Sequence, residues 1–263
     1  MNKVIDGHLH VYPPEINCLI LNTCLRPSGR ATDLVLQEAK VSQALALPLP
    51  DTSLLSTYQA NSYVLEESKK YSSLIPIACI DNEIEHWLSL GVKGFKEHVW
   101  MQRRLWENGQ KGTQANIQKW APQYQAIEAA KVPLIIHLGP NPVSQVKSIL
   151  EVAPDIILIL AHCGWAFIAG ERPPVDWDIT IQPLKIYENI YFDLANFYTD
   201  SERVLLRNFI QIFGAQKIIW GSDYPQDSIL PGTSLSWIDS ARLSSGAFEE
   251  ITYSNIKRIL CMY

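Results

Sequence analysis

Short apolar runs that each end in a metal-capable side chain recur along this sequence. Such side chains end or directly follow five of the runs: His8 and His10, His98, His137, His162, and Asp223. Runs that are apolar throughout are typical of parallel strands covered on both faces. A parallel barrel collects the carboxyl ends of its strands at one mouth, so these side chains would gather there. The pattern therefore predicts a metal site at the mouth of a barrel.

The apolar runs alternate with helix-like stretches from end to end, without a linker or an internal repeat. We expect strands at residues 4–9, 42–47, 74–80, 92–97, 134–138, 156–161, 190–194 and 217–220. We expect helices at 32–40, 57–71, 83–90, 114–130, 143–152 and 201–213, and in a tail over about 235–260. Thr32 or Asp33 is the expected N-cap of the first helix, and the stretches 99–113 and 164–179 are expected to be loops.

Eight strands separated by helices match the count of one barrel. No GxGxxG motif follows the first strand, which disfavours a dinucleotide-binding sheet. We therefore expect an α/β fold that is a single (β/α)8 TIM barrel domain over residues 1–263.

Composition disfavours several classes of partner. The net charge of −5 provides no basic field for nucleic acid. No run is long enough to cross a membrane, and five cysteines without CxxC spacing fit a reducing compartment. We therefore expect a cytoplasmic protein that binds a small molecule and neither nucleic acid nor membrane. Homodimers are the commonest assembly of such domains, and the aromatic residues of the chain permit one.

The combined spacing of the histidines indicates a metal site more strongly than any single histidine does. His8 and His10 are two residues apart in a strand, so both imidazoles face the same side and can reach one ion. His137 or His162 alone is more often a hydrogen-bonded core residue, and Asp223 alone suits a turn. Asp6 either orients a ligand imidazole or is a turn residue. Three imidazoles and a carboxylate at strand ends suit Zn²⁺ with an open position for water.

Six short motifs spread over nearly the whole chain resemble the amidohydrolase superfamily. They are DGHLH at 6–10, GFKEH at 94–98, IIHLG at 135–139, LAHCG at 160–164, WGSDYP at 220–225 and NIKRIL at 255–260. The resemblance is to the amidohydrolase-related branch of metal-dependent hydrolases and decarboxylases.

The resemblance implies a ligand set for Zn²⁺ or another divalent ion: His8, His10, His137 and Asp223. In members with one ion, His162 acts on the bound water or the substrate. In members with two ions, His162 binds the second ion and a carboxylated Lys96, or Glu97, bridges the pair. Lys96 and Glu97 face opposite ways in a strand, so only one of them points inward. The simpler alternative is that Lys96 is a free ammonium or pairs with a carboxylate.

The leading interpretation is a metal-dependent hydrolase that uses metal-activated water to cleave an amide, ester or lactone bond of a small substrate. Asp223 would accept the proton of the water, and His162 would polarise the carbonyl group. The alternative is a nonoxidative decarboxylase of the same fold. Two further interpretations are a lactonase that needs no metal and a barrel that binds a metal or ligand without catalysis.

The two long loops contribute aromatic and arginine side chains that suit a planar, anionic substrate. They are Trp100, Arg103, Arg104 and Trp106 in the first loop, and Trp165, Phe167, Arg172 and Trp177 in the second. The same residues equally suit a packed lid or a dimer contact. If these residues contact the substrate, the predicted hydrolase would act on a substrate that carries a carboxylate.

Overall fold

The eight predicted strand positions are present in the computed structural model, which describes residues 3–14, 16, 28–48, 55–98, 114–166, 172–226 and 229–261. The strands are β1 (Ile5–His10), β2 (Gln43–Leu47), β3 (Leu74–Pro76), β4 (Ala78–Cys79), β5 (Phe95–His98), β6 (Leu134–His137), β7 (Leu158–Leu160), β8 (Ile190–Asp193) and β9 (Ile218–Ile219). The short β3 and β4 lie within the one strand expected at 74–80. All recorded pairings are parallel, in the order β1-β2-β3 and β4-β5-β6-β7-β8-β9.

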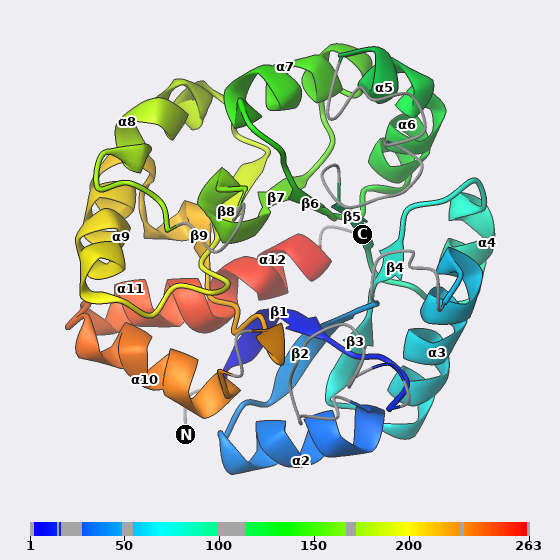
Figure 1. The fold of residues 1–263 in the computed structure, drawn as a ribbon, viewed down its shortest axis with the longest axis horizontal. Helices are drawn as coiled ribbons and strands as arrows, with labels where there is room; N and C mark the ends of the chain where they lie inside the picture. The colour runs from blue at the N-terminus through cyan, green and yellow to red at the C-terminus, as the bar shows by residue number, and fades with distance from the viewer. Residues whose placement is uncertain are drawn as a thin grey trace.

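Backbone hydrogen bonds join the two sets of strands into a ring. Only Ile77 separates β3 from β4, and its N–H donates to the carbonyl of Ala46 on β2 at 3.1 Å. On the other side, the N–H of Gly7 donates to Trp220 O at 2.9 Å. The N–H of Asp223 then donates to His8 O at 2.8 Å. Because these bonds link β1 to the segment that continues β9, the fold is the expected barrel (Figure 1).

Helices surround the strands (Figure 1). They are α2 (Gly29–Glu38), α3 (Thr57–Lys70), α4 (Ile84–Ser89), α5 (Gln114–Lys119), α6 (Ala121–Ala130), α7 (Pro142–Val152), α8 (Trp177–Ile181), α9 (Asp200–Phe213), α10 (Pro231–Ser240), α11 (Ser245–Glu249) and α12 (Asn255–Leu260). The main core fills the layer between helices and strands. None of the described helices combines the length and apolar character that a membrane span requires.

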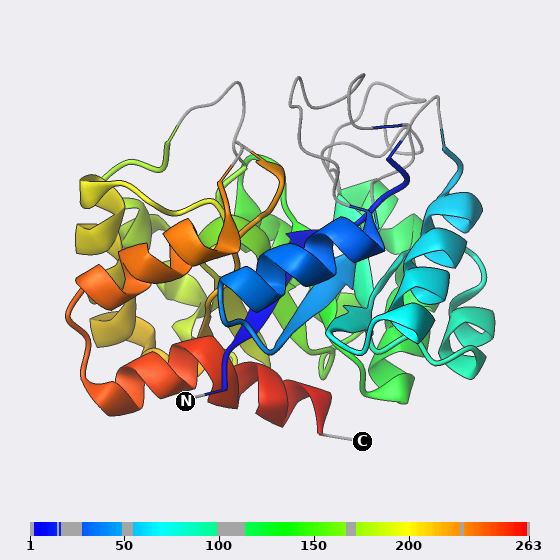
Figure 2. The same ribbon diagram turned by 90° about the horizontal axis from the view of Figure 1, so that it is seen from below.

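The barrel is plugged at the end opposite the mouth. Ile256 and Ile259 of α12 pack in one buried cluster with Ile5, Ile135 and other strand residues. Figure 2 shows α11 and α12 across this end of the molecule, away from the face at which the strands end. The described barrel is therefore open at one end only, where the strand-end side chains lie.

Some details of the sequence prediction were wrong. The single helix expected at 114–130 is divided into α5 and α6. Helix α2 begins at Gly29, because the side chain of Ser28 caps it by accepting a hydrogen bond from Ala31 N–H. Thr32 is buried within this helix instead of capping it. The second long loop ends earlier than expected, since α8 already begins at Trp177.

Candidate metal centre

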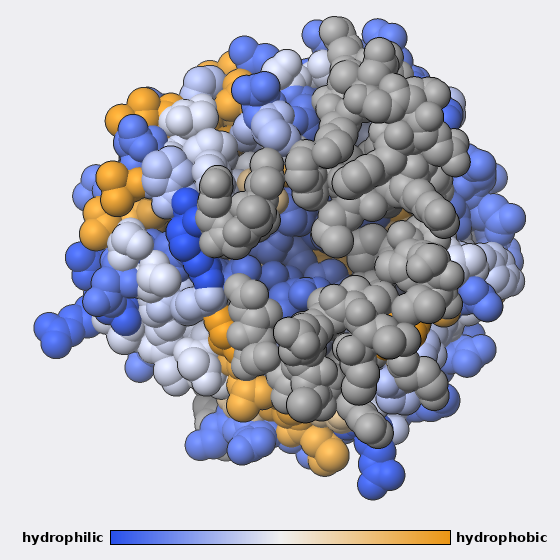
Figure 3. Space-filling model, viewed as in Figure 1, coloured by the Kyte–Doolittle hydropathy of each residue, from blue (hydrophilic) through white to orange (hydrophobic). Residues whose placement is uncertain are grey.

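Five buried histidines form a closed ring at the mouth of the barrel. The ring centroids are 5.3 Å apart for His8 and His10, 6.3 Å for His10 and His98, and 5.0 Å for His98 and His137. The ring closes with 4.7 Å between His137 and His162 and 5.2 Å between His162 and His8. Figure 3 shows a hollow at the centre of this face, and its described floor is hydrophilic.

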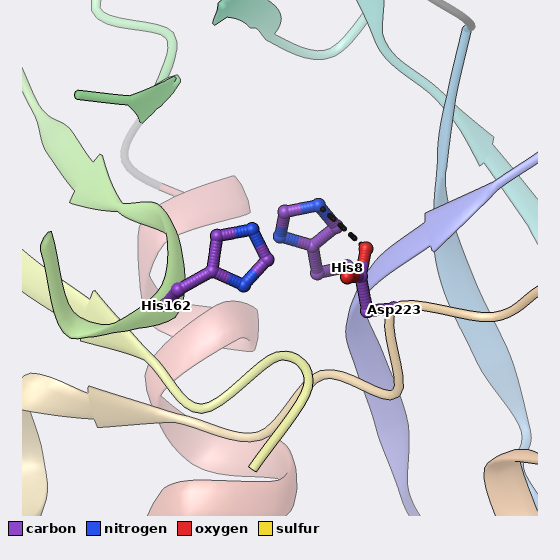
Figure 4. Close-up of side chains that lie close together, drawn as sticks. All are labelled: His8, His162 and Asp223. Atoms are coloured by element: carbon purple, nitrogen blue, oxygen red, sulfur yellow. Dashed lines mark ion pairs between the residues drawn. The ribbon is translucent and has the colours of Figure 1, made fainter. Parts of the chain in front are cut away.

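His8, His162 and Asp223 form the tightest group of metal-capable side chains in the described part of the chain. Each offers one ligand atom, and these atoms lie within 4.8 Å of one another (Figure 4). His10 is close to the same carboxylate, since its Nε2 lies 3.4 Å from Asp223 Oδ1, against 3.5 Å for His8 Nε2. Two of the predicted ligands, His8 and His10, thus lie close to the carboxylate of a third, Asp223. His162 offers a ligand atom to the same group.

Hydrogen bonds fix which ring nitrogen of His8 and of His162 carries the proton. Nδ1 of His8 lies 2.8 Å from Asp193 Oδ2, and Nδ1 of His162 lies 2.9 Å from the carbonyl oxygen of Ala195. An ionised carboxylate and a carbonyl oxygen only accept, so both Nδ1 atoms donate. Each imidazole therefore presents the lone pair of Nε2, as a metal ligand must.

His137 is anchored in the opposite sense. Its Nε2 donates to the carbonyl of Ala166 at 3.0 Å, and its Nδ1 is buried without a hydrogen-bond partner among the described residues. The lone pair on Nδ1 suits a metal or a substrate proton. His137 belongs to the ring of imidazoles but not to the tight group of His8, His162 and Asp223.

Asp193, at the end of β8, is a site residue that the sequence analysis missed. Its Oδ2 accepts from the His8 ring, while Oδ1 accepts from the backbone N–H groups of His162 at 2.9 Å and Ala195 at 3.0 Å. One buried carboxylate thus positions two candidate ligands. A signal is present in the sequence, because Asp193 follows the apolar residues Ile190–Phe192 as the histidines follow their own apolar runs.

Asp6 does not contact a ligand imidazole. Its Oδ1 accepts from the backbone N–H groups of His8 at 3.0 Å and Ser222 at 2.9 Å, which ties β1 to the segment after β9. The strand register shifts between Asp6 and Leu9, and such a bulge changes the facing of the residues that follow. Burial raises the pKa of Asp6 to about 7.

Close approach of β1 and the β9 segment requires glycine. A Cβ atom on Gly221 would lie 2.6 Å from Cβ of His8, and one on Gly7 would lie 2.9 Å from the carbonyl oxygen of Trp220. Both glycines belong to the quoted motifs. The backbones of His162 and Asp223 adopt left-handed conformations, with φ of 55° and 59°.

Lys96 and Glu97 point to opposite sides of β5, as strand alternation requires. The carboxylate of Glu97 accepts a hydrogen bond from the Tyr124 hydroxyl of α6 at 2.8 Å. Lys96 is fully buried, and its charge acts on His8, His98, His137 and His162. The structure therefore brings Lys96, and not Glu97, to the ring of imidazoles.

Burial sets the electrostatic character of the site. It lowers the pKa of four ring members, which favours the neutral imidazole that metals bind: His8, His98, His137 and His162. Burial also lowers the pKa of Lys96 to about 8. For Asp223, burial opposes ionisation, but the hydrogen bond from His10 and the adjacent imidazoles outweigh it and hold the pKa below its usual value. The site thus combines neutral imidazoles with an ionised carboxylate.

The aromatic and arginine residues of the second long loop that the structure describes contact other protein residues. Arg172 donates to the carbonyl of Asn196 at 2.6 Å, forms an ion pair with the buried Glu202 at 3.2 Å, and stacks over Tyr198. Trp165 and Trp177 pack edge to face, with ring centroids 4.8 Å apart. These contacts are those of a packed loop. The remaining predicted loop residues lie outside the described residues: Trp100, Arg103, Arg104, Trp106 and Phe167.

The family model for amidohydrolases matches residues 5–260. The chain belongs to the amidohydrolase family. It is therefore a member of an enzyme family, and the resemblance seen in its motifs is confirmed. No protein of curated function matches the chain.

Several solved structures of amidohydrolases and related enzymes share the fold. A zinc-bound amidohydrolase from Burkholderia multivorans has a TM-score of 0.77 at 13% identity, covering 98% of this chain and 99% of that one. A probable 2-pyrone-4,6-dicarboxylic acid hydrolase from Acinetobacter baumannii, with citric acid bound, has a TM-score of 0.74 at 17% identity over 99% of both chains. A 5-carboxyvanillate decarboxylase from Sphingomonas paucimobilis has a TM-score of 0.71 at 13% identity over 99% of both chains. At these identities the likeness establishes the fold.

Proposed function

We propose that this amidohydrolase is a metal-dependent hydrolase that cleaves an amide, ester or lactone bond of a small molecule. The observation that carries the proposal is the group of His8, His162 and Asp223, whose ligand atoms converge within 4.8 Å. Their chemistry supports a metal, because the two imidazoles each present Nε2 and the Nε2 of His8 is buried without a hydrogen-bond partner among the described residues.

The residues that would hold the ion are His8, His10, Asp223 and either His137 or His162, with Zn²⁺ as the proposed ion. When bound, the metal supplies a Lewis acid that lowers the pKa of water and polarises substrate oxygens. The zinc-bound relative from Burkholderia multivorans supports this choice of metal. We take one ion per chain as the working proposal. A second ion would recruit Lys96 and the remaining histidine of the pair, while Glu97 is turned toward α6.

Asp223 is the group best suited to accept and return a proton. Its carboxylate is ionised, because hydrogen bonding and nearby imidazoles keep its pKa low. Its Oδ1 is about equally far from the Nε2 atoms of His8 and His10, at 3.5 and 3.4 Å. A carboxylate held there can take a proton from water and pass it to the leaving group. The histidine of the pair His137 and His162 that does not bind the ion would face the substrate carbonyl.

Nonoxidative decarboxylation is the second candidate reaction. The 5-carboxyvanillate decarboxylase that shares the fold supports it. The same ring of imidazoles would serve this reaction. Asp223 or a ring histidine would donate a proton to the carbon atom that loses carbon dioxide, and no water would attack the substrate. In either case we propose a small-molecule substrate, with neither nucleic acid nor membrane as a partner, and a homodimer as the assembly.

Zinc content and Asp223→Asn test the proposal together. We expect about one zinc per chain by plasma mass spectrometry in protein purified without chelator. We expect Asp223→Asn to lose turnover of a panel of lactones, esters and amides by about a hundredfold or more, within the range assigned to general acid–base groups. Uptake of oxygen-18 from labelled water identifies hydrolysis, and release of carbon dioxide identifies the lyase. Full activity after removal of all metal would refute metal dependence.

A further inference from the structure

The β5 side of the site carries two polar groups that the proposed one-ion reaction does not use. Lys96 and His98 lie two residues apart on this strand, so their side chains point to the same side. Lys96 is fully buried and His98 is 6% exposed. Nζ of Lys96 and both ring nitrogens of His98 have no hydrogen-bond partner in the described part of the chain. Buried polar atoms are normally paired, so three unpaired atoms from one strand indicate a missing ligand.

His98 differs in this respect from the other members of the ring. Protein groups engage one nitrogen in each of the others: Asp193 for His8, Asp223 for His10, Ala166 for His137 and Ala195 for His162. No described residue orients the imidazole of His98 in the same way. An unanchored imidazole is poorly prepared to be a metal ligand, but it can donate to or accept from a substrate.

The order of the ring places His98 opposite the edge formed by His8 and His162. Its neighbours in the ring are His10 and His137, at 6.3 and 5.0 Å between centroids. The remaining edge, formed by His8 and His162 at 5.2 Å, belongs to the group that includes Asp223. A small substrate bound over the ring at His98 would therefore lie beside His10 and His137 and face the edge formed by His8 and His162.

Charge at the site favours an anion. The carboxylates that act on Lys96 are those of Asp193 and Asp223, and both are already engaged with histidines. A bound divalent ion and the ammonium of Lys96 carry three positive charges against the two negative charges of these carboxylates. A buried excess of positive charge is stabilised by an anionic ligand.

We propose that Lys96 and His98 form an anion-binding pair that holds a carboxylate of the substrate, while its reacting bond faces His8, His162 and Asp223. The ammonium of Lys96 donates to one carboxylate oxygen and an N–H of the His98 ring donates to the other. This inference rests on the proposed function, because it assumes that the ring of imidazoles is the substrate site. It names the substrate class as small carboxylic acids.

Matched acids and amides test the pair without knowledge of the substrate. Binding of benzoate and salicylate is compared with that of benzamide and salicylamide by calorimetry, up to millimolar concentrations. Each titration is run on zinc-loaded protein and on protein treated with chelator. We expect both acids to bind more tightly than their amides in zinc-loaded protein. The preference should be smaller after chelation, because the ion no longer contributes its charge and only Lys96 and His98 donate to the carboxylate. Preference for the acid after chelation isolates the contribution of the protein side chains from that of the metal.

Substitutions then assign the preference to the two residues. We expect Lys96→Met to weaken binding of the acids by about ten- to a hundredfold, as for loss of a charged hydrogen bond, and to leave the amides unchanged. His98→Gln should weaken the acids less, and Lys96→Arg should retain the preference for acids. Lys93→Met is the matched control, because Lys93 is an exposed lysine on the same segment. Circular dichroism verifies that each variant is folded.

Three results would overturn the inference. One is the absence of acid binding in wild-type protein, in both metal states. Another is acid binding that requires zinc and is equal in Lys96→Met and wild type, which would assign the carboxylate to the metal alone and leave the proposed function standing. The third is a carbamate carbon signal on Lys96 after labelling with carbon-13 bicarbonate. Loss of metal binding with retained acid preference would instead refute the metal-dependent function and keep the anion-binding pair.

Discussion

Replacement of Asp193 by asparagine separates metal affinity from stability. In the native site, Oδ2 accepts from Nδ1 of His8 at 2.8 Å, and Oδ1 accepts from the backbone N–H groups of His162 and Ala195. An asparagine amide retains one accepting oxygen for the two backbone groups. Its NH₂ group then faces Nδ1 of His8 and favours the tautomer with the proton on Nε2. The nitrogen that would bind the metal is thereby blocked.

The size of the effect follows from these contacts. In the variant, the metal-binding tautomer of His8 lacks the hydrogen bond that Nδ1 donates to the charged carboxylate in the wild type, which is worth about 1.5–3 kcal/mol. We therefore expect zinc affinity to fall by about ten- to a hundredfold in Asp193→Asn. Asp193→Ala leaves three buried donors without their acceptor, at about 1–3 kcal/mol each. That variant should lose about 3 kcal/mol or more of unfolding free energy in addition to its zinc affinity.

Competition with a chromophoric chelator measures zinc affinity, and urea denaturation of the metal-free protein measures stability. Asp155→Asn is the matched control, since Asp155 is exposed and precedes β7, at the end of the barrel opposite the mouth. Wild-type zinc affinity in Asp193→Asn would refute the reasoning. So would a loss of stability in Asp193→Asn as large as that in Asp193→Ala, because the asparagine should still bind the two backbone groups.

Three further predictions concern the ring and its scaffold. The unfolding free energy of metal-free protein should fall as the pH drops below about 6.5, by up to about 1.4 kcal/mol per pH unit for each imidazole whose pKa burial lowers. The unfolded chain binds those protons and the native site does not; Asp6, with its pKa raised to about 7, opposes the trend by one proton. Urea titrations that show no loss between pH 7 and pH 5 would contradict this. Gly221→Ala should displace His8, because the added Cβ would lie 2.6 Å from Cβ of His8. We expect zinc binding to weaken at least about tenfold in the chelator competition. Unchanged zinc affinity would show that β1 can move aside without displacing the ligand. Asn61→Ala removes two buried hydrogen bonds to the backbone of Cys79, at 2.7 and 3.0 Å, and should lower the unfolding free energy by about 2 kcal/mol while zinc affinity stays unchanged; an unaltered urea midpoint would argue against it.

The strand positions of this fold were predictable because each strand is covered on both faces. Continuous apolar runs at 134–138, 156–161 and 190–194 each contain one observed strand. The polar residue that ends a run then marks the mouth of the barrel, which is why the histidines and Asp223 were found from sequence. Strand alternation also placed Lys96 and Glu97 correctly on opposite faces.

The missed features depend on contacts that strand periodicity does not encode. The bulge between Asp6 and Leu9 changes which residues of β1 share a face, and of the two roles left open for Asp6 the structure does not show the contact with a ligand imidazole. The ion pair of Arg172 with Glu202 joins residues far apart in the sequence, and it engages a side chain that had been considered for the substrate. Which histidines bind the ion, and how many ions are bound, stays a prediction.

The left-handed backbone at His162 and Asp223 affects how this site can be dissected by mutation. An L-residue with a Cβ is disfavoured in this region by about 1–2 kcal/mol, and asparagine, aspartate and histidine tolerate it better than alanine does. Alanine at either position would therefore remove a ligand and also strain the turn that carries it, so its phenotype would mix two causes. Asparagine suits both turns and removes only the chemistry. The same preference limits which residues can replace His162 or Asp223 during evolution, because a new ligand at either position must also tolerate the left-handed backbone conformation.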